Sequence, residues 1–154
     1  MSQFVPAHLG KWEPLFRDLL EGDTMPLNDE GVWMLGDKPG LVAIFEDGEP
    51  VYLTSSSGIA RTLATFIKGG AECEFRTLVA TVDLGASAKT AAERAREGPL
   101  AQRINKRVAK MRYRVAPGPA AQLEPLAAAF TVVADPRYNG LTARANRALD
   151  ALPQ

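Results

Sequence analysis

Basic side chains are concentrated in one short stretch of this chain, and their types and spacing point to a defined chemistry. The stretch extends from Arg94 to Arg114 and contains Arg94, Arg96, Arg103, Lys106, Arg107, Lys110, Arg112 and Arg114. Cations at this density can follow the phosphates of a nucleic-acid backbone. The alternative is a solvated helix face that pairs with acidic side chains elsewhere in the chain.

The charge of the whole chain leaves both interpretations open. Residues 1–60 carry ten acidic and three basic side chains, whereas residues 61–154 carry fifteen basic and eight acidic ones. The formal net charge of zero is therefore the sum of −7 for residues 1–60 and +7 for residues 61–154. The acidic part of one copy could also attract the basic part of another copy, so a homo-oligomer is a further possibility.

Sulfur and imidazole chemistry is sparse. Cys73 is the one cysteine and His8 the one histidine, so the sequence predicts neither an intrachain disulfide nor a structural zinc site. A single free thiol is typical of a reducing compartment, and we expect a cytoplasmic location. No apolar run approaches the ~20 residues that span a bilayer, so we expect no membrane partner.

A run of hydroxyl groups, Thr54 to Ser57, offers a second kind of phosphate contact. Ser55 and Ser56 would precede a predicted helix, where hydroxyl and backbone donors can bind phosphate. N-capping of that helix explains the same residues without a ligand.

Helices and strands must position these residues. A chain of 154 residues with 46% hydrophobic side chains is long enough and apolar enough for one domain. Leu41–Phe45 and Pro50–Leu53 read as two strands, because the intervening Asp47-Gly48 is typical of a tight hairpin. Further on, Met111, Tyr113 and Val115 alternate with Lys110, Arg112 and Arg114. That alternation predicts a third strand with its basic side chains outward.

Helical spacing predicts the remaining elements. Helices are expected near residues 12–20, 58–67, 87–97, 99–108, 123–133 and 141–152, while residues 75–84 fit a strand or a helix. Gly22 would end the first and Gly69-Gly70 the second, and Pro125 suits only a first turn. We therefore expect an α/β (α+β) fold, with a small three-stranded, mostly antiparallel sheet flanked by helices. Residues 1–31 form an N-terminal helical extension, 32–140 the domain and 141–154 a short C-terminal helix.

Two short motifs lie in the predicted hairpin, Pro39-Gly40-Leu41-Val42-Ala43-Ile44 and Val51-Tyr52-Leu53-Thr54. Arg61 follows on the next helix. Near the end come Leu123-Glu124 and then Pro136-Arg137-Tyr138-Asn139. With the order of hairpin, helix, connecting segment, third strand and helix, these residues resemble the GIY-YIG nuclease domain over residues 32–140, whose first and second motifs correspond to the two in the hairpin.

The resemblance implies a DNA endonuclease that hydrolyses phosphodiesters with one divalent metal. Tyr52 would help to deprotonate water, and Arg61 would stabilise the charge of the transition state. Glu124 would hold the metal, Mg²⁺ or Mn²⁺, and Asn139 would anchor the site. The implied settings are DNA repair, restriction or mobile elements, with DNA as the partner and RNA as an alternative.

Several positions depart from the family pattern. Val42 stands where the first tyrosine is expected, and Thr54 replaces the glycine of the second motif. The usual arginine position falls on Thr62, and a shift of one residue to Arg61 is a rotation of ~100° on a helix. These departures make a nucleic-acid-binding module that has lost cleavage a second hypothesis. Charge-driven self-association is the third, and ionic strength would separate it from the others.

Each candidate residue also has a structural interpretation. Tyr52 fits cross-strand packing, and Glu124 fits an acidic side chain at a helix N-terminus. Arg61 fits a solvated helix residue, and Asn139 fits a cap or a turn.

Overall fold

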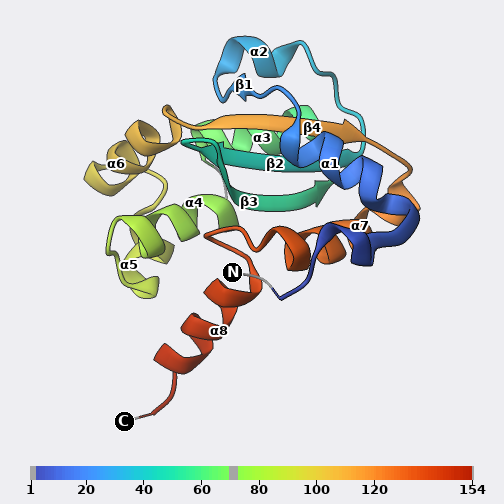
Figure 1. Cartoon of the computed structure of the whole chain (residues 1–154). Coiled ribbons are helices and arrows are strands. Elements are labelled where there is room, and N and C mark those ends of the chain that lie inside the picture. Colours follow the sequence, from blue (N-terminus) through green and yellow to red (C-terminus); the bar gives the residue numbers. More distant parts are fainter. Residues whose placement is uncertain (1–2, 70–72, 154) are drawn as a thin grey trace.

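A four-stranded antiparallel sheet lies at the centre of the protein, which is described here from a computed structural model over residues 3–69 and 73–153 (Figure 1). The strands follow the order β1-β4-β2-β3. Their bounds are Met25–Pro26 for β1, Gly40–Glu46 for β2, Glu49–Ser56 for β3 and Arg112–Pro117 for β4. Helices cover both faces of the sheet, so the expected α+β class is confirmed.

The predicted hairpin is confirmed as β2 and β3. Asp47 and Gly48 form its turn with φ of 52° and 80°, both in the left-handed region that the tightest hairpin turns require. The register shifts by one residue between Ile44 and Phe45. Every residue of β2 is buried, which makes this strand the middle of the hydrophobic core.

The expectation of three strands is wrong, because the segment before residue 32 contributes a fourth. Met25 pairs with Tyr113 and Pro26 with Arg112, which places β1 at the edge of the sheet beside β4. A strand of two residues is too short to produce an alternating pattern, so the sequence offers no periodic signal for it.

One face of the sheet is covered by the middle of the chain. The helices on this side are α3 (Ile59–Lys68), α4 (Glu74–Leu78), the π-helical turn η2 (Val79–Asp83), α5 (Ala88–Arg94) and α6 (Pro99–Val108). Of the ambiguous residues 75–84, all but the last are thus helical. Gly58, rather than one of the serines, is the N-cap of α3, and Gly69 is its C-cap, while Gly70 lies outside the described residues.

The opposite face is covered by the two ends of the chain. The 3-10 helix η1 (Pro6–Trp12), α1 (Glu13–Glu21) and α7 (Ala120–Ala134) pack there against Leu41, Ala43 and Phe45 of β2. Pro125 lies beyond the first turn of α7, because this helix begins earlier than its apolar spacing predicts. The ring leaves one carbonyl of the preceding turn without its usual helical donor.

Two further helices lie at the periphery. The short helix α2 (Asp29–Trp33) begins at Asn28, whose side chain accepts a hydrogen bond from the Gly31 amide. The last helix, α8 (Leu141–Asp150), projects from the body in Figure 1. None of the helices in the described parts of the chain is long and apolar enough to cross a membrane.

Candidate nucleic-acid interface

Tyr52 is held inside the core on β3, and only 6% of its surface is exposed. Its ring contacts Phe66 and Phe75, and its hydroxyl donates to Oε1 of Glu74 over 2.9 Å. Burial and the neighbouring Glu74 carboxylate raise the pKa of Tyr52. The phenol therefore keeps its proton across the physiological range and is poorly suited to take one from water.

Arg61 and Glu124 lie on helices that cover opposite faces of the sheet. Arg61 is exposed on α3, where its guanidinium pairs with Asp37. Glu124 is exposed on α7, next to Leu123 in the core cluster of the other face. Tyr52 points to the face of α3, so the structure does not bring the three residues of the family pattern to one point.

The metal that the resemblance implies finds no set of protein ligands around Glu124. Among the described residues there is no group of three or more His, Cys, Asp or Glu side chains placed to hold an ion. A magnesium ion can be bound by one or two carboxylates together with substrate phosphates. Within the described residues, a metal at Glu124 would therefore depend largely on substrate phosphates and water for its remaining ligands.

Asn139 clamps the backbone of β3. Its side chain accepts from the Leu53 amide over 3.3 Å and donates to the Leu53 carbonyl over 2.7 Å. The Tyr138 amide donates to the Val51 carbonyl beside it. Residues 138–139 thus cover this edge of the sheet, and Asn139, which is buried, has both ends of its amide occupied.

The two serines of the predicted phosphate contact differ in their surroundings. Ser56 is buried, accepts from the Gly58 amide over 3.0 Å and lies 2.6 Å from the Thr62 hydroxyl. Ser55 is half-buried in β3 and pairs with Leu41. The hydroxyl of Ser56 therefore shapes the turn into α3 and does not face a ligand.

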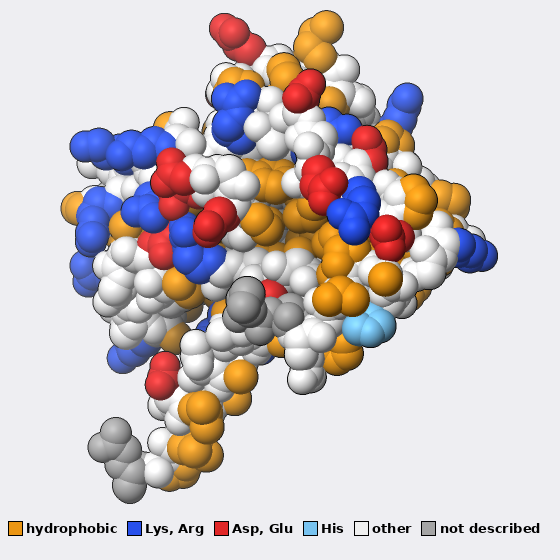
Figure 2. Space-filling view, in the orientation of Figure 1, with side chains coloured by type: hydrophobic (Ala, Val, Ile, Leu, Met, Phe, Trp, Pro, Cys, Tyr) orange, Lys and Arg blue, Asp and Glu red, His pale blue; other side chains and the backbone are white. Residues whose placement is uncertain are grey.

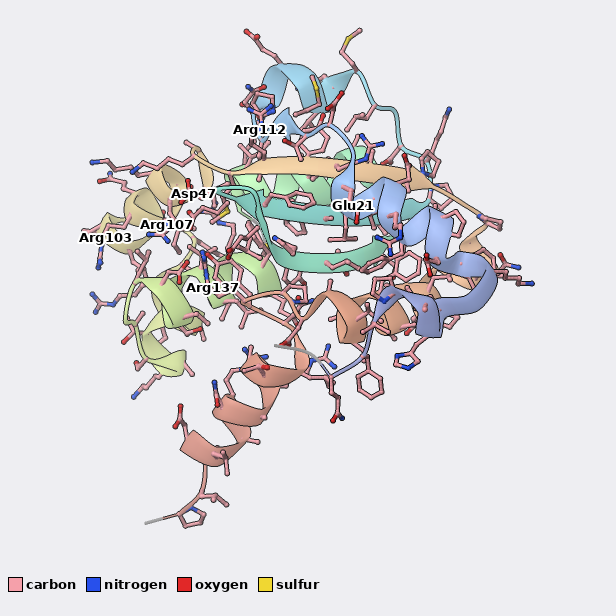
Figure 3. All side chains as sticks on the ribbon, in the orientation of Figure 1. Glu21, Asp47, Arg103, Arg107, Arg112 and Arg137 are labelled. Atoms are coloured by element: carbon pink, nitrogen blue, oxygen red, sulfur yellow. The ribbon has the colours of Figure 1, made fainter. Side chains whose placement is uncertain are left out.

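Two carboxylates and two guanidiniums form a cluster that the sequence did not reveal, and Figure 3 shows its two arginines, Arg107 and Arg137, near each other. Glu46 Oε1 accepts from Arg137 over 2.7 Å and from Arg107 over 2.8 Å. The same two arginines pair with Asp83, which also accepts from the Tyr138 hydroxyl. Burial alone would raise the pKa of Glu46, but the hydrogen bonds from Arg137 and Arg107 outweigh it and lower the pKa.

The other arginines of the basic stretch that lie on β4 are also bound within the chain. Arg112 donates to the hydroxyl and carbonyl oxygens of Thr24. Arg114 pairs with Asp18 of α1 over 2.9 Å and donates to the carbonyl of Asp23 over 2.7 Å. These two side chains fasten the N-terminal segment to the sheet, which is the structural interpretation of the basic stretch.

The outer face of α6 carries cations of a different kind. Arg103, Lys106 and Lys110 are exposed, and none of them forms an ion pair with another described residue. Arg103 and Lys106 are three residues apart and share one side of α6, and Lys110 follows in the turn after the helix. Figure 3 shows Arg103 at the outer edge of α6, and Figure 2 shows Lys and Arg side chains gathered over that side. We call these three residues the α6 basic face.

A hollow of about 640 Å³ adjoins this face between α5 and α6. Arg94 and Arg103 line it together with Glu93 and Glu97, so both signs of charge meet there. Arg96 is exposed at the end of α5. Exposed basic side chains therefore continue from α6 toward α5, with Glu93 and Glu97 among them.

The comparisons with known proteins add no assignment to this geometry. The chain gave no significant match to protein-family models, to curated proteins or to solved structures.

Proposed function

We propose that this protein is a nucleic-acid-binding domain that does not cleave its ligand, and that it binds through the α6 basic face. The observation that carries the proposal is the exposure of Arg103, Lys106 and Lys110, which form no ion pair with any acidic side chain in the described part of the chain. Cations that are already paired gain little from a phosphate, whereas free ones release the counterions that the phosphates hold. DNA is the first ligand to test, with RNA beside it.

Two features favour binding without cleavage. The phenol of Tyr52 is buried and donates to Glu74, and burial raises its pKa. Arg61 and Glu124 lie on helices over opposite faces of the sheet. Cleavage needs such groups within hydrogen-bond reach of one phosphate, and this arrangement does not supply that.

Self-association through charge is less well supported. Five ion pairs join residues 1–60 to residues 61–154 within one chain, and they use Asp18, Asp29, Asp37 and Glu46 on the acidic side. Charges that are neutralised internally leave less attraction for a second copy.

The test is binding of fluorescently labelled duplex DNA, branched DNA and an RNA hairpin, followed by anisotropy from about 50 to 300 mM salt. The test variant combines Arg103→Ala, Lys106→Ala and Lys110→Ala. The matched control combines Lys11→Ala, Lys38→Ala and Arg144→Ala, which removes the same charge from exposed positions elsewhere.

We expect the test variant to lose about tenfold or more in affinity and about three in the salt slope, because each phosphate contact adds about one to that slope. The control should stay within about twofold of the natural chain. An equal loss in both variants, or no binding by the natural chain, would overturn the proposal.

Cleavage is measured in the same samples with Mg²⁺ or Mn²⁺ on supercoiled DNA, beside Glu124→Ala. We expect no nicking by either protein. Nicking that disappears in Glu124→Ala would instead support the one-metal nuclease.

A further inference from the structure

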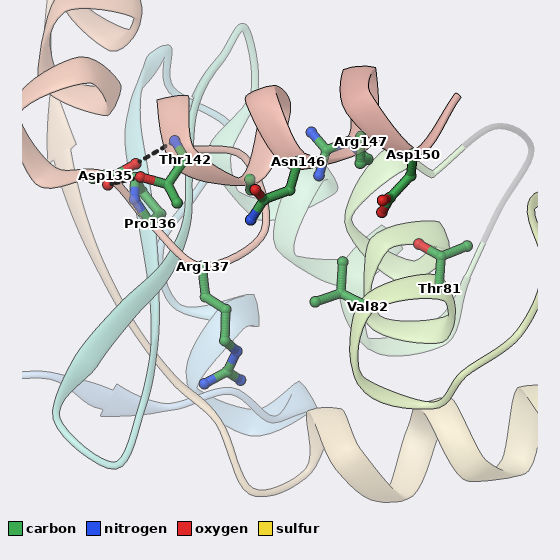
Figure 4. A pocket seen from close by; sticks show the side chains of 10 residues that line it. Thr81, Val82, Asp135, Pro136, Arg137, Thr142, Asn146, Arg147 and Asp150 are labelled. Carbon is green, nitrogen blue, oxygen red and sulfur yellow. Dashed lines mark hydrogen bonds between the residues drawn. The ribbon is translucent and has the colours of Figure 1, made fainter. Parts of the chain in front are cut away.

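Helix α8 is attached to the body through its polar side. Asp135 accepts from both the amide and the hydroxyl of Thr142 at the start of the helix, over 3.0 and 2.7 Å. Arg147 donates to the Tyr138 carbonyl over 2.7 Å. Between the helix and the body lies a hollow of about 560 Å³, and Figure 4 shows Thr142, Asn146 and Asp150 turned toward it.

The opposite side of α8 and of the turn that follows is apolar and uncovered. Leu149 and Leu152 are 65% and 63% exposed, and Leu141 is 41% exposed. With Ala145 and Ala148 they form one stripe, because residues separated by three, four and seven positions share a side of a helix. No residue of α8 is buried, and hydrophobic side chains are visible along the helix in Figure 2.

We infer that the occupant of this stripe is the α8 stripe of a second copy of the chain, packed antiparallel about a twofold axis. The centre line of the stripe reads Leu141, Ala145, Ala148 and, in the turn after the helix, Leu152, with spacings of four, three and four, and Leu149 lies beside it. This order is the same from either end. When one helix is reversed against another, Leu141 meets Leu152 and Ala145 meets Ala148, so the surface is complementary to itself.

The size of the side chains suits the close approach of two helices. Alanines stand at the two central positions and leucines at the two outer ones, so the backbones can come near each other at the crossing point while the leucines close the ends. The flanking positions agree with this arrangement. Arg144 lies on the side of Ala151, and in an antiparallel pair each arginine faces the partner's alanine rather than its arginine.

The dimer is weak and insensitive to salt. Two helices of about three turns cover less area than the roughly 1,200 Å² of a stable interface, so we expect weak association. Its contacts are apolar, so ionic strength does not weaken it as it would weaken a pair held by the −7 and +7 parts of the chain.

Sedimentation equilibrium of the full chain from about 10 µM to 1 mM, a range that detects weak association, tests the inference. We expect reversible dimerisation that is equal at low and high salt. Leu149→Glu with Leu152→Glu should shift the dimerisation constant by tenfold or more. Trp33→Glu with Met34→Glu is the matched control, because these side chains are even more exposed, at 78% and 86%, and lie on α2 and just after it. A natural chain that stays monomeric, or a control that weakens the dimer equally, overturns the inference.

Disulfide trapping tests the orientation in the Cys73→Ser background. Chains with Ala145→Cys are mixed with chains carrying Ala148→Cys and oxidised. We expect the mixed 145–148 disulfide to dominate, whereas a parallel pair would give 145–145 and 148–148 products and would contradict the proposed packing. Binding of the chain to anionic lipid vesicles without self-association at the same concentrations would assign the stripe to a membrane surface instead and overturn the inference.

Discussion

Tyr52 is enclosed by the aromatic rings of Phe66 and Phe75, and its hydroxyl reaches Glu74 at the rim of the core. In this setting the residue acts through packing and one hydrogen bond. Of the two interpretations that the sequence leaves open for Tyr52, these surroundings favour cross-strand packing over proton transfer.

Tyr52→Phe keeps the ring and removes the hydroxyl. We expect a loss of about 1 kcal/mol in the free energy of unfolding, the usual contribution of one hydrogen bond, with unchanged nucleic-acid affinity. Urea denaturation measures the first and anisotropy the second. A double-mutant cycle with Glu74→Gln should assign most of the loss to this pair. A variant of full stability that no longer binds would show that the hydroxyl serves the ligand.

Asn139 is the second residue whose role the structure clarifies, because its amide replaces a strand neighbour for Leu53. Asn139→Ala would leave a buried amide and a buried carbonyl of β3 without partners, so we expect a loss of about 2–4 kcal/mol in unfolding free energy. Asn146→Ala, at an exposed position on α8, is the control and should cost less than about 0.5 kcal/mol. Hydrogen exchange of the Leu53 amide should accelerate in the first variant only.

At the scale of elements, the cluster of Glu46, Asp83, Arg107 and Arg137 joins β2, η2, α6 and the segment after α7. It lies beside the hairpin turn, where β2 ends. Each guanidinium pairs with both carboxylates, so the loss of Glu46 would leave two partly buried arginines to share Asp83.

Glu46→Gln tests the cluster through pH. The pKa of Glu46 is lowered in the folded protein, so the folded state binds fewer protons than the unfolded chain near the ordinary value of about 4.5. The stability from this group is therefore present above that pH and is lost as pH falls through the lowered pKa. We expect the variant to lose about 1–3 kcal/mol at pH 7 and to show a shallower fall in stability below pH 4.5 in urea titrations. Parallel pH curves for the two proteins would contradict this.

On the scale of the whole molecule, some of the opposite charges of the two parts meet inside one copy: among the described residues, four acidic side chains of residues 1–60 pair with five basic side chains of residues 61–154. The N-terminal segment is tied to β4 by Arg112 and Arg114, and α1 covers the sheet with Phe16 and Leu19. The segment that the sequence separates as an extension therefore contributes both a strand and part of the core.

Leu19→Ala and Leu149→Ala compare the two ends of the chain. Leu19 is fully buried, so we expect its truncation to cost about 2–5 kcal/mol in unfolding free energy. Leu149 is 65% exposed, and at low protein concentration its truncation should change stability by less than about 0.5 kcal/mol. Thermal and urea denaturation measure both. A small effect of Leu19→Ala would mean that α1 is not part of the cooperative unit.

The sequence by itself determined the local elements of this protein. Asp47-Gly48 specified the hairpin, the alternation around Tyr113 specified β4, and apolar spacing located α1, α3, α6 and α8. Such signals arise from neighbours along the chain, because turn geometry and periodicity are set within a few residues. The sequence left residues 75–84 undecided between strand and helix, and it did not predict the two-residue strand β1. Propensity alone does not decide the conformation of short or β-branched segments.

Only the tertiary structure decided which charges are free. Arg103 and Arg107 are four residues apart on the same helix, yet one is exposed and unpaired among the described residues while the other binds Glu46 and Asp83. Glu46 lies 61 residues from Arg107 along the chain, so the spacing of neighbouring residues could not predict that the two side chains pair. The placement of Tyr52 and Glu124 relative to the two faces of the sheet was decided in the same way. Packing of distant segments fixes these relations, because burial and pairing depend on what folding brings together and not on spacing along the chain.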